Sequence, residues 1–268
     1  MEKQILYTIG YTLFNSRIGI DLEKMYSTLR NFGVSYLVDV RSVPYSKQYP
    51  QCNMDALKNA GVRFSVPYIH VPELGAKASP IQDVFSKASD IFFDDIFPIA
   101  ASKRPEKTEL QSYEKIVDFN KFRNDEYFMD GIRRIEKAYD KNFTLALMCS
   151  EKEPINCHRY FLVSKKIEQY FGERIEVKHI VNDKQGEIAT VSNVELNKEL
   201  SELIFKREEV RKLNLLEKDL FSNEARIDNY YGETTQKKIE DFCDRYWNLM
   251  HGWKLIDNNN YKQIEEYD

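Results

Sequence analysis

A strand, a helix and a second strand follow one another in the first forty residues, and this order constrains the fold more than any other feature of the sequence. The run QILYTIG at residues 4–10 is rich in β-branched and aromatic residues and ends in glycine, which is typical of a buried strand. Apolar residues at helical spacing predict a helix over residues 21–32 that ends at Gly33, and VSYLVDV at residues 34–40 predicts the next strand. Two strands joined by a helix lie parallel in one sheet, so an α/β fold is expected.

The rest of the first 190 residues continues this alternation. Residues 80–111 mix aromatic and acidic residues with Pro98 and Pro105, which predicts an irregular insertion or a lid over the sheet. We therefore expect a mostly parallel central sheet flanked by helices. Further helices are predicted over residues 54–60, where Gly61 ends the helix, 111–139 and 154–171, and further strands over residues 63–74, 142–149 and 175–181.

The C-terminal part of the chain has a different pattern, with charged helices and no further strand. An apolar stripe over residues 234–251 predicts a helix packed on the helix near residues 200–220 or on the α/β core, with Cys243 as an ordinary core residue. We divide the chain into an α/β domain, residues 1–190, and a C-terminal helical extension, residues 191–268, packed on that core. The stripe consists of Ile239, Phe242, Cys243, Tyr246, Trp247 and Met250.

Composition excludes several classes of protein. The 268 residues carry a net charge of −4 with a pI near 5.8, which argues against a chain-wide affinity for nucleic acid, so nucleic acid is not the favoured partner. No segment approaches the roughly 20 apolar residues of a membrane span, and the amino terminus lacks the apolar stretch of a signal peptide. The four cysteines have no disulfide-framework spacing, so we expect a cytoplasmic protein with reduced thiols and no membrane partner.

Three polar clusters follow predicted strands: GYT at residues 10–12, DVRSVPYS at 39–46 and CSEKEPINCHR at 149–159. In a parallel sheet, ligands bind outside the carboxyl ends of the strands, where loops and helix amino termini gather. The clusters are therefore predicted to meet at one edge of the sheet and to form one pocket. The lining comprises Tyr11, Thr12, Asp39, Arg41, Ser42, Ser46, Cys149, Glu151, Cys157, His158 and Arg159.

The charged members of this pocket suggest a division of roles. Arg41 and Arg159 are expected to hold an anionic group, helped by the hydroxyls and Tyr11, because guanidinium suits phosphate and carboxylate. Asp39 and Glu151 are candidates for acid/base work or for contacts to ligand hydroxyls. Each has a structural alternative: an ion pair that holds a loop for Asp39, a surface arginine for Arg41, and a solvated pair for His158 with Arg159. His70 and His179, at the ends of predicted strands, are more often structural.

The two cysteines of the third cluster extend the chemistry. A thiol at a helix amino terminus ionises more readily, which makes Cys149 or Cys157 a candidate nucleophile beside His158. Glu151 and Glu153 oppose this, because nearby carboxylates disfavour a thiolate. Zinc is an alternative, with a carboxylate as fourth ligand, but the spacing matches no standard zinc knuckle. We therefore predict no metal site, and the sequence identifies no cofactor.

Several ordered blocks of this sequence resemble one known family. The blocks are YTIGYT at residues 7–12, LVDVRSVPYSK at 37–47, YIHVPELG at 68–75, ALMCSEKEPINCHR at 146–159 and VKHI at 177–180. They resemble the prokaryotic family catalogued as domain of unknown function 488, over about residues 5–182. The resemblance implies a compact α/β domain with these blocks around one site. The family usually has His and Ser where this chain has Tyr11 and Thr12, so a catalytic role of that His would be lost or carried by His158.

The function expected from these features is an enzyme that acts on a small anionic or nucleotide-like ligand at the carboxyl edge of the sheet. Cys149, Glu151, Cys157, His158 and Asp39 are its candidate catalytic residues. The alternative is a ligand-sensing or nucleic-acid-binding module that uses the same pocket without catalysis. A minority alternative is rhodanese-like thiol chemistry, whose cysteine-to-arginine loops are shorter and not acidic. Whether the protein is an enzyme stays open at this point.

Overall fold

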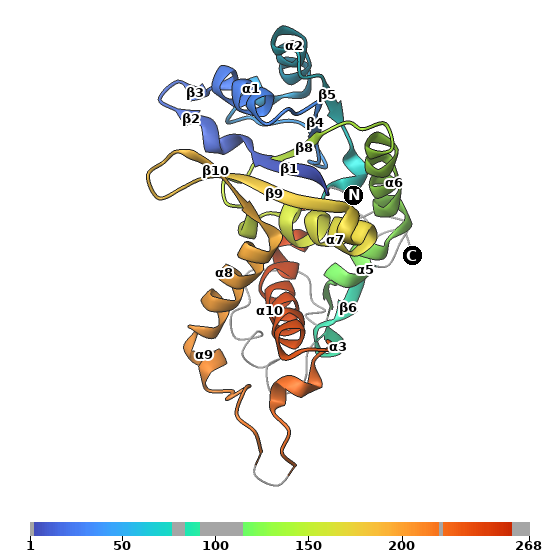
Figure 1. Ribbon diagram of the computed structural model, residues 1–268, viewed down its shortest axis with the longest axis vertical. Helices are drawn as coiled ribbons and strands as arrows, with labels where there is room; N and C mark the ends of the chain where they lie inside the picture. Colours follow the sequence, from blue (N-terminus) through green and yellow to red (C-terminus); the bar gives the residue numbers. More distant parts are fainter. Residues whose placement is uncertain (1–2, 77–83, 92–114, 220–221, 259–268) are drawn as a thin grey trace. The chain divides into compact units, whose positions relative to one another are not determined.

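The computed structural model describes residues 3–76, 84–91, 115–219 and 222–258 (Figure 1). The chain folds into two compact units, each described by itself below. The first unit comprises Met1–Ser79 and Arg123–Asn193, and the second comprises Pro80–Phe122 and Val194–Asp268. The expected division into residues 1–190 and 191–268 stays a prediction. Within the described ranges, no helix has the length and apolar character that crossing a bilayer requires.

The first unit is built on a six-stranded sheet in the order β10-β9-β1-β8-β4-β5. Neighbouring strands run parallel except for β9 and β10, which are antiparallel. The mostly parallel α/β architecture expected from the sequence is thus confirmed. The strands are β1 (Gln4–Gly10), β4 (Tyr36–Asp39), β5 (Tyr68–His70), β8 (Leu145–Cys149), β9 (Ile175–Asn182) and β10 (Ile188–Ser192); a separate short ladder joins β2 (Asn15–Ser16) to β3 (Gly19–Ile20).

Helices cover both faces of this sheet. α1 (Leu22–Asn31) and α2 (Met54–Phe64) lie on one face, and α6 (Glu126–Tyr139) and α7 (Lys165–Phe171) lie on the other (Figure 1). α1 begins where the side chain of Asp21 accepts a hydrogen bond from the backbone N–H of Lys24, which satisfies one of the free donors of the first turn. The observed start of α1 therefore agrees with the helix predicted over residues 21–32.

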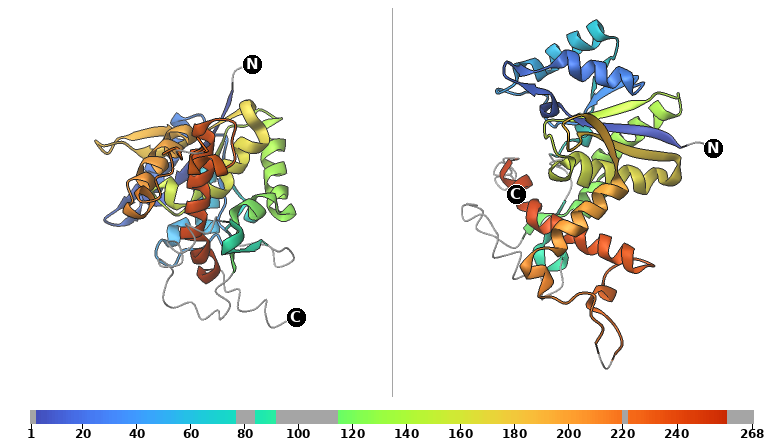
Figure 2. Two further views of the ribbon diagram at one scale, coloured as in Figure 1. Left: turned by 90° about the horizontal axis from the view of Figure 1, so that it is seen from below. Right: turned by 60° about the vertical axis from the view of Figure 1, so that its left-hand side comes forward.

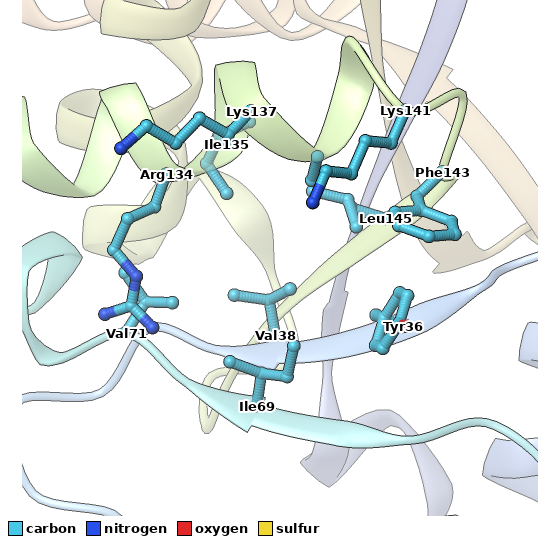
Figure 3. A pocket seen from close by; sticks show the side chains of 11 residues that line it. Tyr36, Val38, Ile69, Val71, Arg134, Ile135, Lys137, Lys141, Phe143 and Leu145 are labelled. Carbon is cyan, nitrogen blue, oxygen red and sulfur yellow. The ribbon is translucent and has the colours of Figure 1, made fainter.

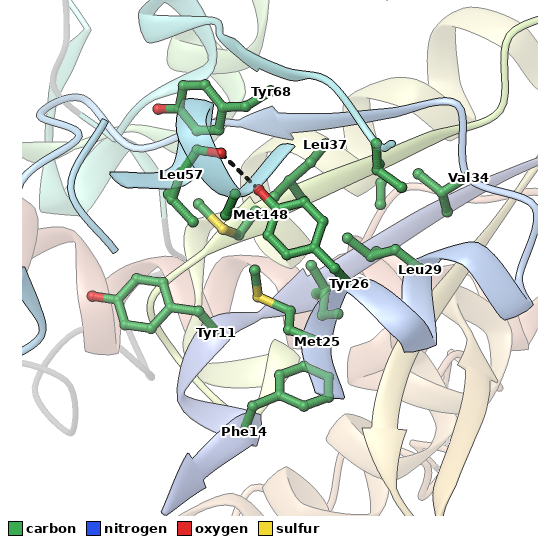
Figure 4. Packing of buried hydrophobic residues seen from close by; sticks show 14 of the residues in the cluster. Tyr11, Phe14, Met25, Tyr26, Leu29, Val34, Leu37, Leu57, Tyr68 and Met148 are labelled. Carbon is green, nitrogen blue, oxygen red and sulfur yellow. Dashed lines mark hydrogen bonds between the residues drawn. The ribbon is translucent and has the colours of Figure 1, made fainter. Parts of the chain in front are cut away.

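Alternation along the strands separates the two halves of the core. Tyr7 and Ile9 of β1 belong to the hydrophobic cluster under α1 and α2, whereas Leu6 and Thr8 point to the other face. Met25 and Tyr26 fill the centre of this cluster with no exposed surface (Figure 4). The Tyr26 hydroxyl donates a hydrogen bond of 2.9 Å to the carbonyl oxygen of Leu57, so its one polar atom is satisfied inside the core.

The second unit contains a short antiparallel ladder and the C-terminal helices (Figure 2). Phe242 has no exposed surface and packs edge-on against Phe205 and Tyr230, which confirms the predicted apolar helix. The predicted packing of this helix on the α/β core stays a prediction. Cys243 is 2% exposed, as expected of a core residue. The elements are β6 (Phe85–Lys87), α3 (Ala88–Ile91), β7 (Lys115–Val117), α9 (Glu208–Arg211) and α10 (Thr235–Asn258). Two further helices, α5 (Phe119–Asn124) and α8 (Asn193–Phe205), contain the positions in the chain where one unit ends and the other begins.

Several predicted boundaries are wrong. A single helix is expected over residues 111–139, but the structure has β7, α5 and α6 over residues 115–139, and residues 111–114 lie outside the described part. Asp125 separates the two helices, because it follows α5 and caps α6 by accepting a hydrogen bond from the N–H of Phe128. α2 continues past Gly61 to Phe64 and ends at Ser65, whose φ of 60° is left-handed. Gly61 is needed for close packing instead, because a Cβ there would lie 2.8 Å from the Val66 carbonyl oxygen.

The predicted strand over residues 63–74 shrinks to β5, and Pro72 starts a short 3-10 turn after it. β10 was missed, since its residues are all only half-buried and show no alternation between apolar and polar. The expected insertion or lid at residues 80–111 falls largely on residues outside those that the structure describes.

Candidate functional site

Three parallel strands bring the predicted polar clusters to one edge of the first unit. β8 lies between β1 and β4, and its last residue, Cys149, stands opposite Gly10 in register, while Asp39 stands opposite Met148. Gly10, Asp39 and Cys149 are each the final residue of their strand. The convergence of these clusters follows directly from the parallel register.

The loop after Cys149 passes very close to the end of β1. A Cβ on Gly10 would lie 1.8 Å from the carbonyl oxygen of Glu151, so only glycine allows this approach. Thr12, one residue beyond Tyr11, holds the same loop: its backbone N–H and its hydroxyl both donate to the carbonyl oxygen of Ser150. The end of β1 therefore positions the cysteine loop.

Arg159 fixes this loop from its other end. The side chain has no exposed surface, and its guanidinium donates to the carbonyl oxygens of Glu151 and Lys152. Arg159 begins a π-helical turn over Arg159–Ser164 that continues into α7, and the Ser164 hydroxyl donates to the Arg159 carbonyl oxygen at 2.6 Å. Such turns widen a helix locally and often occur at functional sites. The predicted solvated pair of His158 and Arg159 does not form, since both are buried.

Cys149, Cys157 and His158 form a compact buried cluster. The Sγ of Cys149 lies 3.6 Å from Nδ1 of His158, and the Sγ of Cys157 lies 3.9 Å from the same atom. Nε2 of His158 is 2.9 Å from the carbonyl oxygen of Val40, and because a carbonyl can only accept, Nε2 carries the hydrogen. The three residues are 4%, 2% and 9% exposed, respectively.

Proton affinities in this cluster are strongly perturbed. The hydrogen bond to Cys157 holds the pKa of Cys149 well below its usual range, and the charges of His158 and Arg159 add to this against the opposing effect of burial. Burial and the neighbouring Cys149 raise the pKa of Cys157. Burial acts to lower the pKa of His158, but the charge and hydrogen bond of Cys149 outweigh it, so this pKa is raised. The pair of thiols thus favours one negative charge shared between two sulfurs.

Asp39 and Arg41 form a second cluster, on the face of the sheet that α1 and α2 cover. The guanidinium binds the Asp39 carboxylate in a bidentate manner at 2.6–3.1 Å, and the carboxylate also accepts from the Arg41 backbone N–H and the Tyr68 hydroxyl. Asp39 is fully buried and Arg41 is 7% exposed. Burial acts to lower the pKa of Arg41, but Asp39 outweighs it and raises this pKa. The geometry is the ion pair that was the structural alternative for Asp39.

The remaining predicted residues surround these two clusters. Tyr11 is buried, and the centre of its ring lies 5.3 Å from the Arg41 guanidinium carbon, so this ring faces Arg41. Ser42 lies against the backbone of Gly75, and Ser46 accepts a hydrogen bond from the N–H of Tyr49. Glu151 has an exposed side chain, and its carbonyl contacts Arg159. Their predicted roles stay predictions.

Sequence reasoning missed the partners that hold the site. The carbonyl of Val40 orients His158, the hydroxyl of Tyr68 binds Asp39, and the carbonyl of Cys52 accepts from Arg41 at 2.8 Å. Nε2 of His70 contacts the Arg41 carbonyl at 2.8 Å. Tyr68 and His70 fall in the YIHVPELG block, which was the one available signal, whereas backbone carbonyls leave no trace in a residue pattern.

His179, in β9, is a fully buried histidine of the sheet. Nδ1 lies 2.7 Å from the Thr8 hydroxyl, and Nε2 is hydrogen-bonded to the side-chain oxygen of Asn193. Burial lowers the pKa of His179 to about 3, even though the bond to Asn193 acts in the opposite direction. With both ring nitrogens taken by neutral partners, this histidine fits the structural role expected of it.

A cavity of about 250 Å³ lies elsewhere, between α6 and the strands β4 and β5 (Figure 3). Aliphatic and aromatic side chains form most of its wall, and Arg134 and Lys137 of α6 extend along it together with Lys141, which follows the helix. Arg134 is already bound by Glu73 at 2.8 Å. None of the predicted site residues lines this cavity, so size alone does not locate the chemistry, and the site is assigned from the convergence of reactive side chains.

Among the residues that the structure describes, Cys149, Cys157 and His158 are the group whose donor atoms are placed to hold a metal ion. The donor atoms lie within 4.8 Å of one another. Two sulfurs and one imidazole nitrogen suit zinc or another borderline-soft metal better than magnesium or calcium, which prefer oxygen.

Fold and site together define an α/β protein with a mostly parallel sheet and a cysteine–cysteine–histidine centre at the carboxyl edge of its strands. Residues 21–165 match the model of the family described as Domain of unknown function DUF488. This match covers more than half of the chain, and the protein therefore belongs to that family. Tyr11 and Thr12 precede the matched residues. No curated protein and no solved structure matches the chain.

Proposed function

We propose that the protein is an enzyme that acts on a small anionic or nucleotide-like ligand at the carboxyl edge of the sheet, with Cys149, Cys157 and His158 as its reacting centre. The convergence of two sulfurs on one imidazole nitrogen, at 3.6 and 3.9 Å, is the observation that carries the proposal. A core needs no such arrangement, because buried thiols pack as small hydrophobic groups without polar partners.

An anionic ligand is favoured by the charge next to this centre. Arg159 is fully buried, and its hydrogen-bond partners among the described residues are carbonyl oxygens, so no carboxylate neutralises it. Its Nε atom is buried and has no hydrogen-bond partner among the described residues, and the same holds for Nη1 of Arg41. Buried positive charge and unpartnered donors attract and orient negative groups. Arg41 and Arg159 would accordingly hold the anionic part of the ligand.

The half-buried hydroxyls complete the proposed pocket. Ser42 and Ser46 would hydrogen-bond the ligand beside Arg41, together with Tyr11 and Thr12. Glu151, exposed at the mouth of the cysteine loop, would serve as an acid or base or would bind ligand hydroxyls. Asp39 would act mainly by holding Arg41, since its carboxylate is already fully engaged.

A cytoplasmic location belongs to this proposal. All four cysteines are free, including the two that lie close together at the centre. Free thiols persist in reducing compartments, where a thiol-containing centre keeps its function.

The test uses the full chain with AMP and inorganic phosphate as probes. We expect both at millimolar concentration to raise the thermal midpoint, and we expect turnover of a panel of nucleotides and phosphate esters, followed by phosphorus NMR. Cys149→Ser and His158→Gln should abolish turnover, whereas Cys243→Ser, a buried cysteine in the other unit, should retain it. Absence of both binding and turnover would overturn the proposal.

Partial outcomes also decide between functions. Binding without turnover across the panel would reject an enzyme and favour the ligand-sensing alternative. Binding of a DNA oligonucleotide that weakens steeply with salt would favour a nucleic-acid module instead, because release of counterions from phosphates makes such binding salt-dependent.

A further inference from the structure

The orientation of His158 leaves a metal-binding nitrogen facing two sulfurs. Nε2 donates its hydrogen to the Val40 carbonyl at 2.9 Å, so the lone pair of the neutral ring is on Nδ1. That nitrogen is the one that lies 3.6 Å from Cys149 and 3.9 Å from Cys157. Histidines that bind metals usually donate their second N–H to a carbonyl or carboxylate in this way, which fixes both the tautomer and the direction of the ring.

The spacing of the donors fits one ion. Zinc binds sulfur at about 2.3 Å and imidazole nitrogen at about 2.0–2.1 Å, so a tetrahedral site separates sulfur from nitrogen by about 3.6 Å. The observed separations of 3.6 and 3.9 Å lie close to this value, and all donor atoms fall within 4.8 Å of one another. Little movement is needed for the three side chains to share an ion.

The backbone around these donors is fixed before any ion binds. Cys149 ends a central strand, and Thr12 and Arg159 tie the following loop to β1 and to the start of the π-helical turn. A preorganised, buried donor set loses little entropy on binding, which is what a tight site requires.

We propose that Cys149, Cys157 and His158 bind one zinc ion, with the fourth position open to water or to an anionic ligand. The described residues supply three protein donors, and three protein ligands with one exchangeable position are typical of catalytic rather than structural zinc. This assignment replaces the sequence-based expectation of no metal site. Only the role of the open position rests on the proposed function, in which the anionic group of the ligand would occupy it.

The test is the metal content of the full chain. The protein is purified without chelator, equilibrated with zinc chloride and freed of excess metal. Its zinc content is then measured by inductively coupled plasma mass spectrometry. We expect one zinc per chain in the wild type and about 100-fold or more weaker binding in Cys149→Ser, Cys157→Ser and His158→Gln. Cys52→Ser and Cys243→Ser are matched controls, because both remove a buried cysteine outside the cluster, and both should keep the zinc.

A second measurement keeps the inference testable if a variant misfolds. Cobalt added to the metal-free wild type should give the intense thiolate-to-metal absorption and the visible bands of tetrahedral coordination. Wild-type protein without zinc and without these bands would overturn the inference, as would full zinc in all three cluster variants. Zinc bound without any effect of AMP or phosphate would instead reject the proposed function and leave the metal site standing. Turnover that survives complete zinc removal would reject the role of the open position in binding the ligand.

Discussion

The carboxyl edge of the sheet carries two polar clusters that differ in how their charges are balanced. In the first, the Asp39 carboxylate receives the Arg41 guanidinium, the Arg41 backbone N–H and the Tyr68 hydroxyl. In the second, Cys149 and Cys157 face one nitrogen of His158, and no carboxylate of the described residues joins them. The clusters project from opposite faces, since Asp39 alternates in phase with Leu37 of the α1 and α2 core, whereas Cys149 alternates out of phase with Met148 of that core.

This difference separates a structural lock from a reactive centre. A buried charge is tolerated when an opposite charge and hydrogen bonds surround it, and removing one partner then leaves the other uncompensated. The thiols and imidazole are close enough to share a proton or an ion, yet they carry few bonds on which folding depends. Substitutions in the first cluster should therefore change stability most, and substitutions in the second should change binding and chemistry most.

The largest expected effect is that of Asp39→Asn. The substitution keeps the shape of the side chain but leaves the Arg41 guanidinium buried without a counter-charge, which costs about 3–5 kcal/mol of stability. Cys149→Ser in metal-free protein should cost only about 1 kcal/mol. Hydrogen exchange of peptides from β1 and β8 measures both, because it reports the opening of the sheet unit separately from the other unit.

The double substitution Asp39→Asn with Arg41→Met controls for this contrast. Removing the arginine as well should restore a large part of the loss, since no uncompensated charge then stays buried. Equal losses in Asp39→Asn and Cys149→Ser would contradict the distinction between the two clusters.

The sequence predicts that the polar clusters meet at one edge of the sheet, but it does not predict which cluster is a structural ion pair and which is a reactive centre. Gly10, Asp39 and Cys149 end apolar runs that read clearly as strands, and a parallel sheet brings such ends together whatever the loops contain. Whether Arg41 binds a ligand or its own neighbour depends on the loop path, which brings Tyr68 and the Cys52 carbonyl to the pair. Long-range contacts of that kind leave no periodicity in the chain.

Errors in the fold have a similar cause. The run near Ile116 continues the apolar spacing of α6, so periodicity alone merged a strand and two helices into one helix. The residues that separate them, Asp118 and Asp125, act through local bonds to backbone N–H groups, such as the bond from Phe128 to Asp125. Where short elements follow one another, capping residues predict the element boundaries better than the spacing of apolar residues does.

The next largest expected effect is the dependence of stability on pH that is due to the buried His179. His179 has a pKa of about 3 in the folded protein and about 6.5 when unfolded, so between these values only the unfolded chain binds the proton. Stability due to this residue is present above pH 6.5 and is lost as the pH falls, by about 1.4 kcal/mol per pH unit. We expect about 2.3 kcal/mol less stability at pH 4.5 than at pH 6.5 from His179 alone.

His179→Gln isolates this contribution from that of the carboxylates. Hydrogen exchange of the sheet is measured in the wild type and the variant at several pH values and corrected for the intrinsic exchange rate. The free energy of opening should rise less steeply with pH in the variant, by about 1.4 kcal/mol per pH unit, which corresponds to one proton. Identical slopes would mean that His179 titrates alike in both states, and that its bonds to Thr8 and Asn193 do not keep it neutral.

The smallest effect concerns the hydroxyl that ties the cysteine loop to β1. Thr12→Val removes the bond from Oγ1 to the Ser150 carbonyl but keeps the shape of the side chain and the backbone bond. Loss of one such bond should cost about 1 kcal/mol of stability, and the looser loop should weaken zinc binding about fivefold. Thr12→Ser keeps the hydroxyl and should behave like the wild type. Competition with a chromophoric zinc chelator measures the affinity, and if the valine and serine variants bind zinc equally, the cysteine loop is held by Arg159 and the backbone rather than by this hydroxyl.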